Sequence, residues 1–177
     1  MKLSGKQIRD LDEAIQIPEI KRYPITFILD NLYDTYNIGG IFRLADAYAI
    51  QKIYICGESE TPPNHRIAKA SIGTYKIVPW EYQPTVVDAI KKLRSENPEI
   101  QILCVEQSES SVAFQSFDYH APLAIIVGNE TTGVSRQAME ASDAILEIPM
   151  FGINSSLNVI VSTAVVVSHI YSKMDPA

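Results

Sequence analysis

Three polar segments, each following an apolar and strand-like run, carry the side chains of this sequence that could do chemistry. The candidate reactive groups in these segments are a permanent cation, a carboxylate, two amides and a hydroxyl. They are Asn37 and Arg43 in segment 31–46, Glu130 in segment 128–135, and Ser156 and Asn158 in segment 148–159. Each segment also has a purely structural interpretation, as a surface arginine, a plain turn and a helix N-cap, respectively.

In the first segment, helical periodicity predicts a helix over residues 38–50, after a polar loop over residues 31–37. At 100° per residue, Arg43 points about 140° away from the apolar stripe of that helix. The arginine is therefore free to reach a ligand at the ends of the strands. Gly39 and Gly40 would let a backbone or a phosphate approach closely. The alternative is a surface arginine paired with Asp46.

The second and third segments are loops between a strand and a helix start. Gly128–Ser135 is either a plain turn or a binding loop, and it matches neither the Walker A pattern nor the dinucleotide fingerprint. In the third segment, Ser155 or Ser156 is the expected helix N-cap. Asn158 is unusual there, because a deeply apolar helix follows and a buried amide needs partners that its neighbours do not offer.

Apolar runs that alternate with helical patterns predict the elements that position these side chains. Ser4 is expected to cap the first helix, and Pro84 is expected at the first position of another. Strands are predicted at 25–29, 52–56, 75–79, 100–105, 123–127 and 144–148, and helices at 4–16, 38–50, 65–70, 84–94, 135–141 and 155–171. Strands that are apolar throughout indicate an α/β domain with a parallel sheet covered on both faces. Ligands of such sheets bind beyond the carboxyl ends of the strands. The positions to watch follow Leu29, Val105, Val127 and Ile148.

Composition and charge limit the class of protein. The net charge is −6, but residues 1–94 carry 13 basic and 11 acidic side chains, whereas residues 95–177 carry 2 basic and 10 acidic ones. Any contact with nucleic acid is therefore expected in the N-terminal half. The N-terminus has no secretory apolar stretch, and the longest apolar run, 159–167, is too short for a bilayer span. These features predict a cytoplasmic protein without a membrane segment.

The cysteines and histidines predict no metal centre. Cys56 and Cys104 each lie in an apolar run, and are expected to be buried free thiols in a reducing compartment. The three histidines share no ligand-like spacing with either cysteine.

Taken together and in this order, the three segments resemble the signature motifs of the SpoU (TrmH) family of SPOUT methyltransferases. The resemblance extends from Ile25 to Tyr171. It implies a single domain over residues 1–177, with a C-terminal trefoil knot and a catalytic knot region at about 122–172. Residues 131–132 depart from the family, since Thr131 and Thr132 stand where it commonly has a glycine and an acid.

The resemblance also implies roles for individual residues. The catalytic set would be Asn37, Arg43, Glu130, Ser156 and Asn158. The cofactor, S-adenosylmethionine, would contact Leu103, Val105, Gly128, Asn129, Ile148, Met150, Leu157 and Asn158. Glu130 and Asn37 would hold Arg43 or the substrate ribose, while Ser156 and Asn158 would line the methyl-transfer site. Arg43 would act either as a base activated by the substrate phosphate or as a cation that stabilises the developing alkoxide.

The function implied is methylation of a ribose 2′-hydroxyl in tRNA or rRNA, with tRNA favoured. The resemblance is to minimal family members, without an added N-terminal RNA-binding domain or a long C-terminal helix. A homodimer through the apolar helix 157–171 is expected. RNA is expected to contact basic residues of the N-terminal half: Lys6, Arg9, Lys21 and Arg22. Two alternatives are a catalytically silent SPOUT-fold RNA-binding or assembly factor, and an unrelated flavodoxin-like nucleotide binder. The intact motif residues disfavour the former, and the missing phosphate-loop glycines and lysine disfavour the latter.

Overall fold

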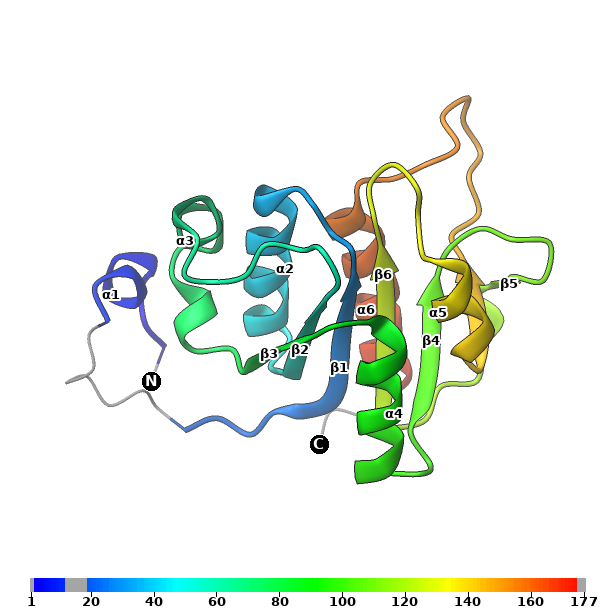
Figure 1. Cartoon of the computed structure of the whole chain (residues 1–177), viewed down its shortest axis with the longest axis horizontal. Helices are drawn as coiled ribbons and strands as arrows, with labels where there is room; N and C mark the ends of the chain where they lie inside the picture. The colour runs from blue at the N-terminus through cyan, green and yellow to red at the C-terminus, as the bar shows by residue number, and fades with distance from the viewer. Residues whose placement is uncertain (1, 12–18, 175–177) are drawn as a thin grey trace.

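The computed structural model describes residues 2–11 and 19–174, and is organised around a parallel sheet with helices on both faces (Figure 1). The sheet has seven strands in the order β3-β2-β1-β6-β4-β7-β5, and every pairing is parallel. The strands are β1 (Tyr23–Asp30), β2 (Ile50–Cys56), β3 (Trp80–Gln83), β4 (Gln101–Val105), β5 (Val112–Ala113), β6 (Leu123–Gly128) and β7 (Ala144–Glu147). The α/β class and the parallel sheet predicted from the sequence are confirmed.

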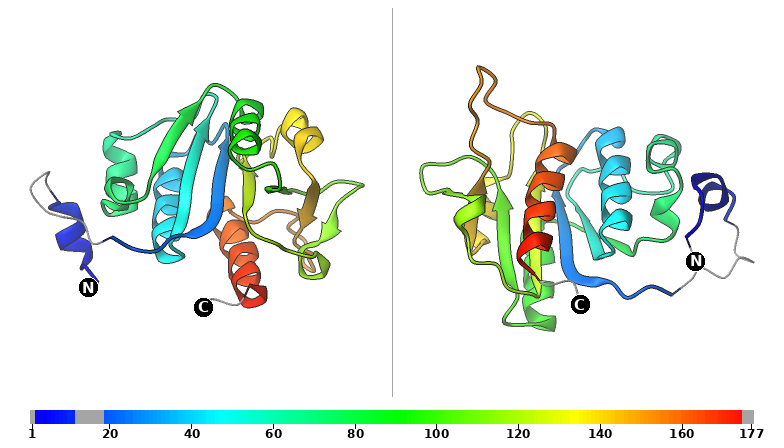
Figure 2. Two further views of the ribbon diagram at one scale, coloured as in Figure 1. Left: turned by 90° about the horizontal axis from the view of Figure 1, so that it is seen from below. Right: turned by 180° about the vertical axis from the view of Figure 1, so that it is seen from behind.

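Apart from the first, which buries no side chain, the α-helices divide into two layers, each with its own part of the core (Figure 2). They are α1 (Gly5–Arg9), α2 (Thr35–Ala47), α3 (His65–Ser71), α4 (Val86–Glu96), α5 (Arg136–Ala141) and α6 (Val159–Lys173), with two short 3-10 helices, η1 (Thr74–Lys76) and η2 (Phe114–Ser116). Buried side chains of α2, α3 and α6 share one cluster, and those of α4 and α5 share the other. The central strands β1, β4 and β6 contribute to both clusters, as expected for strands covered on both faces.

The predicted strand at 75–79 is wrong, because the chain turns there before it can extend. Gly73 has a positive φ of 86°, and the η1 turn closes with Ile77 N and Val78 N donating to Thr74 O at 3.0 and 2.9 Å. The strand of this region, β3, begins only at Trp80. The two-residue strand β5 and the η2 turn have no counterpart in the prediction.

Several helix starts also differ from the prediction, each because another side chain provides the cap. Helix α2 begins at Thr35, since Asp34 Oδ1 accepts from Tyr36 N at 2.8 Å, so Asn37 lies in a helix and not in a loop. Thr85 caps α4, which leaves Pro84 outside the helix. Asn158, and neither Ser155 nor Ser156, caps α6. Ser4 does cap α1, which ends at Arg9; the predicted part beyond residue 11 lies outside the described residues.

Within the described residues, no helix is both long enough and apolar enough to cross a membrane.

Candidate active site

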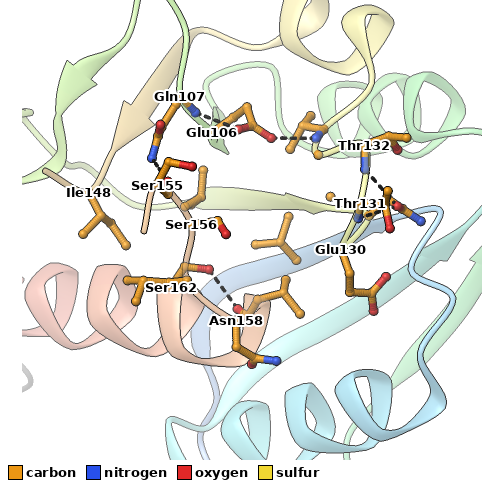
Figure 3. Close-up of a pocket in the computed structure, with 18 of the residues that line it drawn as sticks. Glu106, Gln107, Glu130, Thr131, Thr132, Ile148, Ser155, Ser156, Asn158 and Ser162 are labelled. Carbon is orange, nitrogen blue, oxygen red and sulfur yellow. Dashed lines mark hydrogen bonds between the residues drawn. The ribbon is translucent and has the colours of Figure 1, made fainter. Parts of the chain in front are cut away.

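A cavity of about 680 Å³ opens at the carboxyl ends of β4, β6 and β7 (Figure 3). Its volume lies within the range of small-molecule sites, roughly 300–1,000 Å³. All but one of the predicted cofactor residues line it: Val105, Gly128, Asn129, Ile148, Met150, Leu157 and Asn158. Leu103 does not, because it lies two residues before the end of β4 and is fully buried in the core. The sheet therefore brings the ends of three segments that are distant in sequence to one site.

The loop after β6 is shaped mainly by the side chain of Asn129. Its Oδ1 accepts from Thr131 N at 2.8 Å and from Thr132 N at 3.1 Å, and its Nδ2 donates to Asn31 O at 2.8 Å. Asn129 N and Gly133 N each donate to the other residue's carbonyl oxygen. Because only backbone groups of Thr131 and Thr132 take part, the departure from the family pattern leaves these contacts intact.

A buried carboxylate, Asp30, ties the end of β1 to the end of this loop. It is 2% exposed, and its Oδ2 accepts from Ser135 N at 2.7 Å while its Oδ1 accepts from Asn31 Nδ2 at 2.8 Å. Sequence reasoning did not identify Asp30. The available signal was an acid directly after the apolar run 25–29, at the carboxyl end of a predicted strand.

Glu106, also not identified, holds the same loop from the other side. Its Oε2 accepts from Val134 N at 2.9 Å and its Oε1 accepts from Gln107 N at 2.8 Å. Asp30 and Glu106 thus bind the amides of two consecutive residues, Val134 and Ser135. Glu106 lines the cavity and immediately follows Val105, one of the positions that the predicted strand ends marked.

The three motif segments are joined by a chain of side-chain hydrogen bonds. Asn158 Nδ2 donates to Asn37 Oδ1 at 3.0 Å, and Asn37 Nδ2 donates to Glu130 Oε1 at 2.9 Å. Glu130 also accepts from Asp34 N at 3.2 Å and from Tyr33 N at 3.4 Å, just before the N-terminus of α2. A carboxylate there is stabilised by the helix dipole. Glu130 and Asn37 therefore hold each other; none of the bonds that the described residues form links them to Arg43.

The third segment is the most exposed wall of the cavity. Asn158 itself is exposed, so the expectation of a buried amide with few partners is wrong: Oδ1 caps α6 through Ile160 N at 2.9 Å, and Nδ2 binds Asn37. Ser156 lines the cavity and, among the residues that the structure describes, hydrogen-bonds to Asn154 alone. Phe151 and Ile153 are 97% and 107% exposed.

Arg43 is exposed on α2, as its helical angle predicts, but it does not line the cavity. No salt bridge within the described part of the chain pairs it with Asp46, the alternative considered from the sequence. The adjacent glycines serve helix packing. A Cβ on Gly39 would lie 2.5 Å from Ala70 Cβ in α3, and one on Gly40 would lie 2.2 Å from Ile160 Cδ1 in α6.

Of the four basic residues expected to bind RNA, Arg22 has another role. It donates to Ile50 O at 3.0 Å and to Ile77 O at 2.6 Å, and burial lowers the pKa of its guanidinium. A guanidinium committed to backbone carbonyls is not free for phosphate. The other three, Lys6, Arg9 and Lys21, are exposed.

Cys56 and Cys104 are free and buried, as predicted. Burial raises the pKa of both thiols to about 12. Among the residues that the structure describes, no group of three or more His, Cys, Asp or Glu is placed to hold a metal ion.

Comparison with known proteins places this chain in a family. The SpoU rRNA methylase family model matches residues 24–168. A tRNA (guanosine(18)-2′-O)-methyltransferase of Escherichia coli (strain K12) is 29% identical over 147 residues, which are 82% of this chain and 62% of that protein. The protein of the same name from Aquifex aeolicus (strain VF5) is 30% identical over 164 residues, covering 91% of this chain and 74% of the relative.

A solved structure supports the same fold. An AdoMet-bound rRNA methyltransferase from Sinorhizobium meliloti superposes with a TM-score of 0.78 at 24% identity, covering 94% of this chain and 60% of that one. This chain spans only 62% of the Escherichia coli relative's length. The family match excludes the alternative of an unrelated flavodoxin-like nucleotide binder. With most of its length matched, the chain belongs to the SpoU rRNA methylase family.

Proposed function

We propose that this chain is a cytoplasmic RNA methyltransferase that transfers a methyl group from S-adenosylmethionine to a ribose 2′-hydroxyl. The observation that carries the proposal is the hydrogen-bonded chain Asn158–Asn37–Glu130, which joins all three motif segments at the edge of one cavity. The names of the Escherichia coli and Aquifex aeolicus relatives support 2′-O-methylation.

The cavity suits the cofactor in its chemistry as well as in its size. Val105, Leu146 and Ile148 provide an apolar wall for the adenine ring, while Glu106 and the backbone of loop 128–135 offer hydrogen-bonding groups for the polar parts. Bound S-adenosylmethionine supplies an electrophilic methyl group on a sulfonium. The residues of the chain then have to place a ribose oxygen about 3–3.5 Å from that methyl group. Asn158 and Ser156 would line this position, and their place at the border of the cavity supports the assignment.

We assign the trefoil knot to residues 122–172, within a single domain over residues 1–177. The path of the chain supports this. Segment 148–158 leads from β7, which pairs with β4, to α6. Helix α6 packs against α2, β4 and β6, in the same helical layer as α2 and α3 (Figure 1).

Arg43 is proposed to act in the cavity of a second copy of the chain. It is exposed and does not line the cavity of its own subunit. If Arg43 is catalytic, it would therefore have to reach the cavity of a partner subunit. Helix α6 carries a partly exposed stripe at Val161, Val165 and Ser168, with Val161 48% exposed, which suits a homodimer interface. Light scattering at micromolar concentration should give twice 19.7 kDa. A monomer would contradict this assignment.

In that composite site, Arg43 serves as a cation and not as a base, because a guanidinium stays protonated in proteins. It would hold the substrate phosphate and stabilise the oxyanion that develops as the 2′-hydroxyl attacks the methyl group. The hydroxyl proton would pass to solvent, and the sulfonium would leave as neutral S-adenosylhomocysteine. Glu130 and Asn37 would hold the first turn of α2 against the loop after β6, and so fix the helix that carries Arg43 within its own subunit.

The proposed substrate is tRNA, in line with the names of the two relatives. Exposed Lys6, Arg9 and Lys21 would contact its backbone. With a net charge of −6, non-specific affinity for RNA should be weak and fall steeply with salt.

The deciding experiment is transfer of a tritiated methyl group to bulk RNA, followed by nucleoside analysis. Label is expected on a ribose 2′-oxygen. Arg43→Ala should lower the rate by about 10²-fold or more, while binding of S-adenosylmethionine in a calorimetric titration stays nearly unchanged. Arg66→Ala, at another exposed arginine, is the matched control and should retain activity. Label on a base would overturn the chemistry, and full activity of Arg43→Ala would overturn the site. Cofactor binding without any transfer would favour the silent RNA-binding alternative.

A further inference from the structure

Glu106 is a carboxylate that is held in the cavity wall and can accept further hydrogen bonds. It follows β4 directly and is half-buried. Each of its two oxygens accepts one backbone N–H, from Val134 and from Gln107. An ionised carboxylate has about four lone-pair sites, so roughly two stay available for a ligand donor.

The approach of the loop to Glu106 is unusually close. Gly133 has a positive φ of 71°, and a Cβ at this position would lie 2.1 Å from Glu106 Oε2. The loop therefore passes directly over the carboxylate, which limits its movement. A carboxylate held in this way is preorganised to accept hydrogen bonds from whatever occupies the cavity.

The position of Glu106 along the sheet selects the part of the ligand that it meets. The strands of this part of the sheet lie in the order β1-β6-β4-β7. The hydrogen-bonded pair Asn37 and Glu130 lies on the β1–β6 side. The apolar residues Leu146 and Ile148 lie at or just after the end of β7. Glu106, directly after the end of β4, stands between them (Figure 3). In an adenosyl sulfonium compound, the ribose lies between the reactive methyl end and the adenine.

Resting on the proposed function, we infer that Glu106 recognises the ribose of the cofactor by accepting hydrogen bonds from its vicinal 2′- and 3′-hydroxyls. An acid near the carboxyl end of a parallel strand binds ribose hydroxyls in the same way in other nucleotide-binding α/β folds. Glu106 is thus a binding residue that discriminates ribose from deoxyribose. It acts on the cofactor and has no part in the methyl transfer itself.

The test is a calorimetric cycle with two ligands: S-adenosylhomocysteine and its 2′,3′-dideoxy analogue. Glu106→Gln should bind S-adenosylhomocysteine about 10- to 100-fold more weakly than the wild type, as expected for a lost hydrogen bond to a charged group. For the dideoxy analogue, the two proteins should differ by less than about twofold, because the penalty requires both partners. Glu109→Gln, in the same segment but exposed and outside the cavity, is the control and should bind like the wild type.

An equal loss for both ligands would overturn the inference, since Glu106 would then only anchor the loop. No loss would overturn it too. If Glu106→Gln does not fold, the wild type still tests the part played by the hydroxyls, because it should bind the dideoxy analogue about 10- to 100-fold more weakly than S-adenosylhomocysteine. Equal affinities would refute the role of the hydroxyls. If the wild type binds neither ligand, the proposed function is overturned together with this inference. If the wild type and Glu106→Gln bind S-adenosylhomocysteine with equal affinity, only this inference is overturned.

Discussion

Two loops of the same cavity, 128–135 and 148–158, are held in opposite ways. The first is anchored at its start by Asn129, which binds Asn31 O, and at its end by Glu106 and Asp30, which bind consecutive amides. The second has every residue from 151 to 158 exposed. Its anchors are one bond from Gln107 Nε2 to Ser155 O at 2.7 Å and the contacts of Asn158.

One wall of the site is therefore rigid and the other is able to move. Loop 128–135 is preorganised, so a ligand that binds there pays little for ordering it. Loop 148–158 has few buried apolar contacts, and segments of this kind open at low free energy. Its exposed Phe151 and Ile153 leave it able to change conformation when a ligand or a second copy of the chain arrives.

The largest expected contrast is in thiol reactivity. Because burial raises the pKa of Cys56 and Cys104 to about 12, almost no thiolate is present at pH 8. A cysteine introduced by Phe151→Cys would be exposed, with an ordinary pKa near 8.5. It should be alkylated at least about 10³-fold faster than either native thiol. Peptide mass mapping over time checks this; slow labelling at position 151 would mean that the loop is covered in solution.

A smaller contrast is expected between glycines of the two loops. A Cβ on Gly128 would lie 2.2 Å from Val134 N, so Gly128→Ala must displace backbone and should cost about 2–3 kcal/mol. A Cβ on Gly152 meets nothing within 4 Å, so Gly152→Ala should stay within about 0.5 kcal/mol of the wild type. Urea unfolding of both variants measures the difference. Equal destabilisation would show that loop 148–158 is packed as tightly as its neighbour.

The smallest effect concerns Asn158, which links the exposed loop both to α6 and to α2. Asn158→Ala should cost about 1 kcal/mol, because Ile160 N loses its cap. Asn158→Ser should recover most of this stability while losing the bond to Asn37. Asn154→Ala is the control within the same loop, and should change the unfolding free energy by less than about 0.5 kcal/mol. If Asn154→Ala costs as much as Asn158→Ala, Asn158 is not a distinct anchor.

Where hydrophobic pattern decides structure, the sequence was sufficient. The runs that became β1, β2, β4 and β6 are mostly apolar on both faces, and a sheet covered on both faces buries them. The strand ends pointed to Gly128 and to the residues after Ile148, and the family resemblance added Leu157; all of these line the cavity. Where capping decides, the sequence was less reliable. Asp34, Thr85 and Asn158 are all good N-caps, but the periodicity, Pro84 and the neighbouring serines, respectively, suggested other helix starts.

The sequence by itself determined the fold class, the parallel sheet and the side of the sheet where ligands bind, because these depend on periodicity and on the direction of strands. Only the tertiary structure decided which polar groups meet. Asp30 and Ser135 are 105 residues apart, and Asn37 and Asn158 are 121 apart, so no local pattern links them. The same holds for Arg22, whose charge indicated RNA but whose guanidinium is used by the carbonyls of Ile50 and Ile77. A hydrogen bond requires its donor and acceptor to lie about 2.7–3.2 Å apart, and only the packed sheet brings these atoms to that distance.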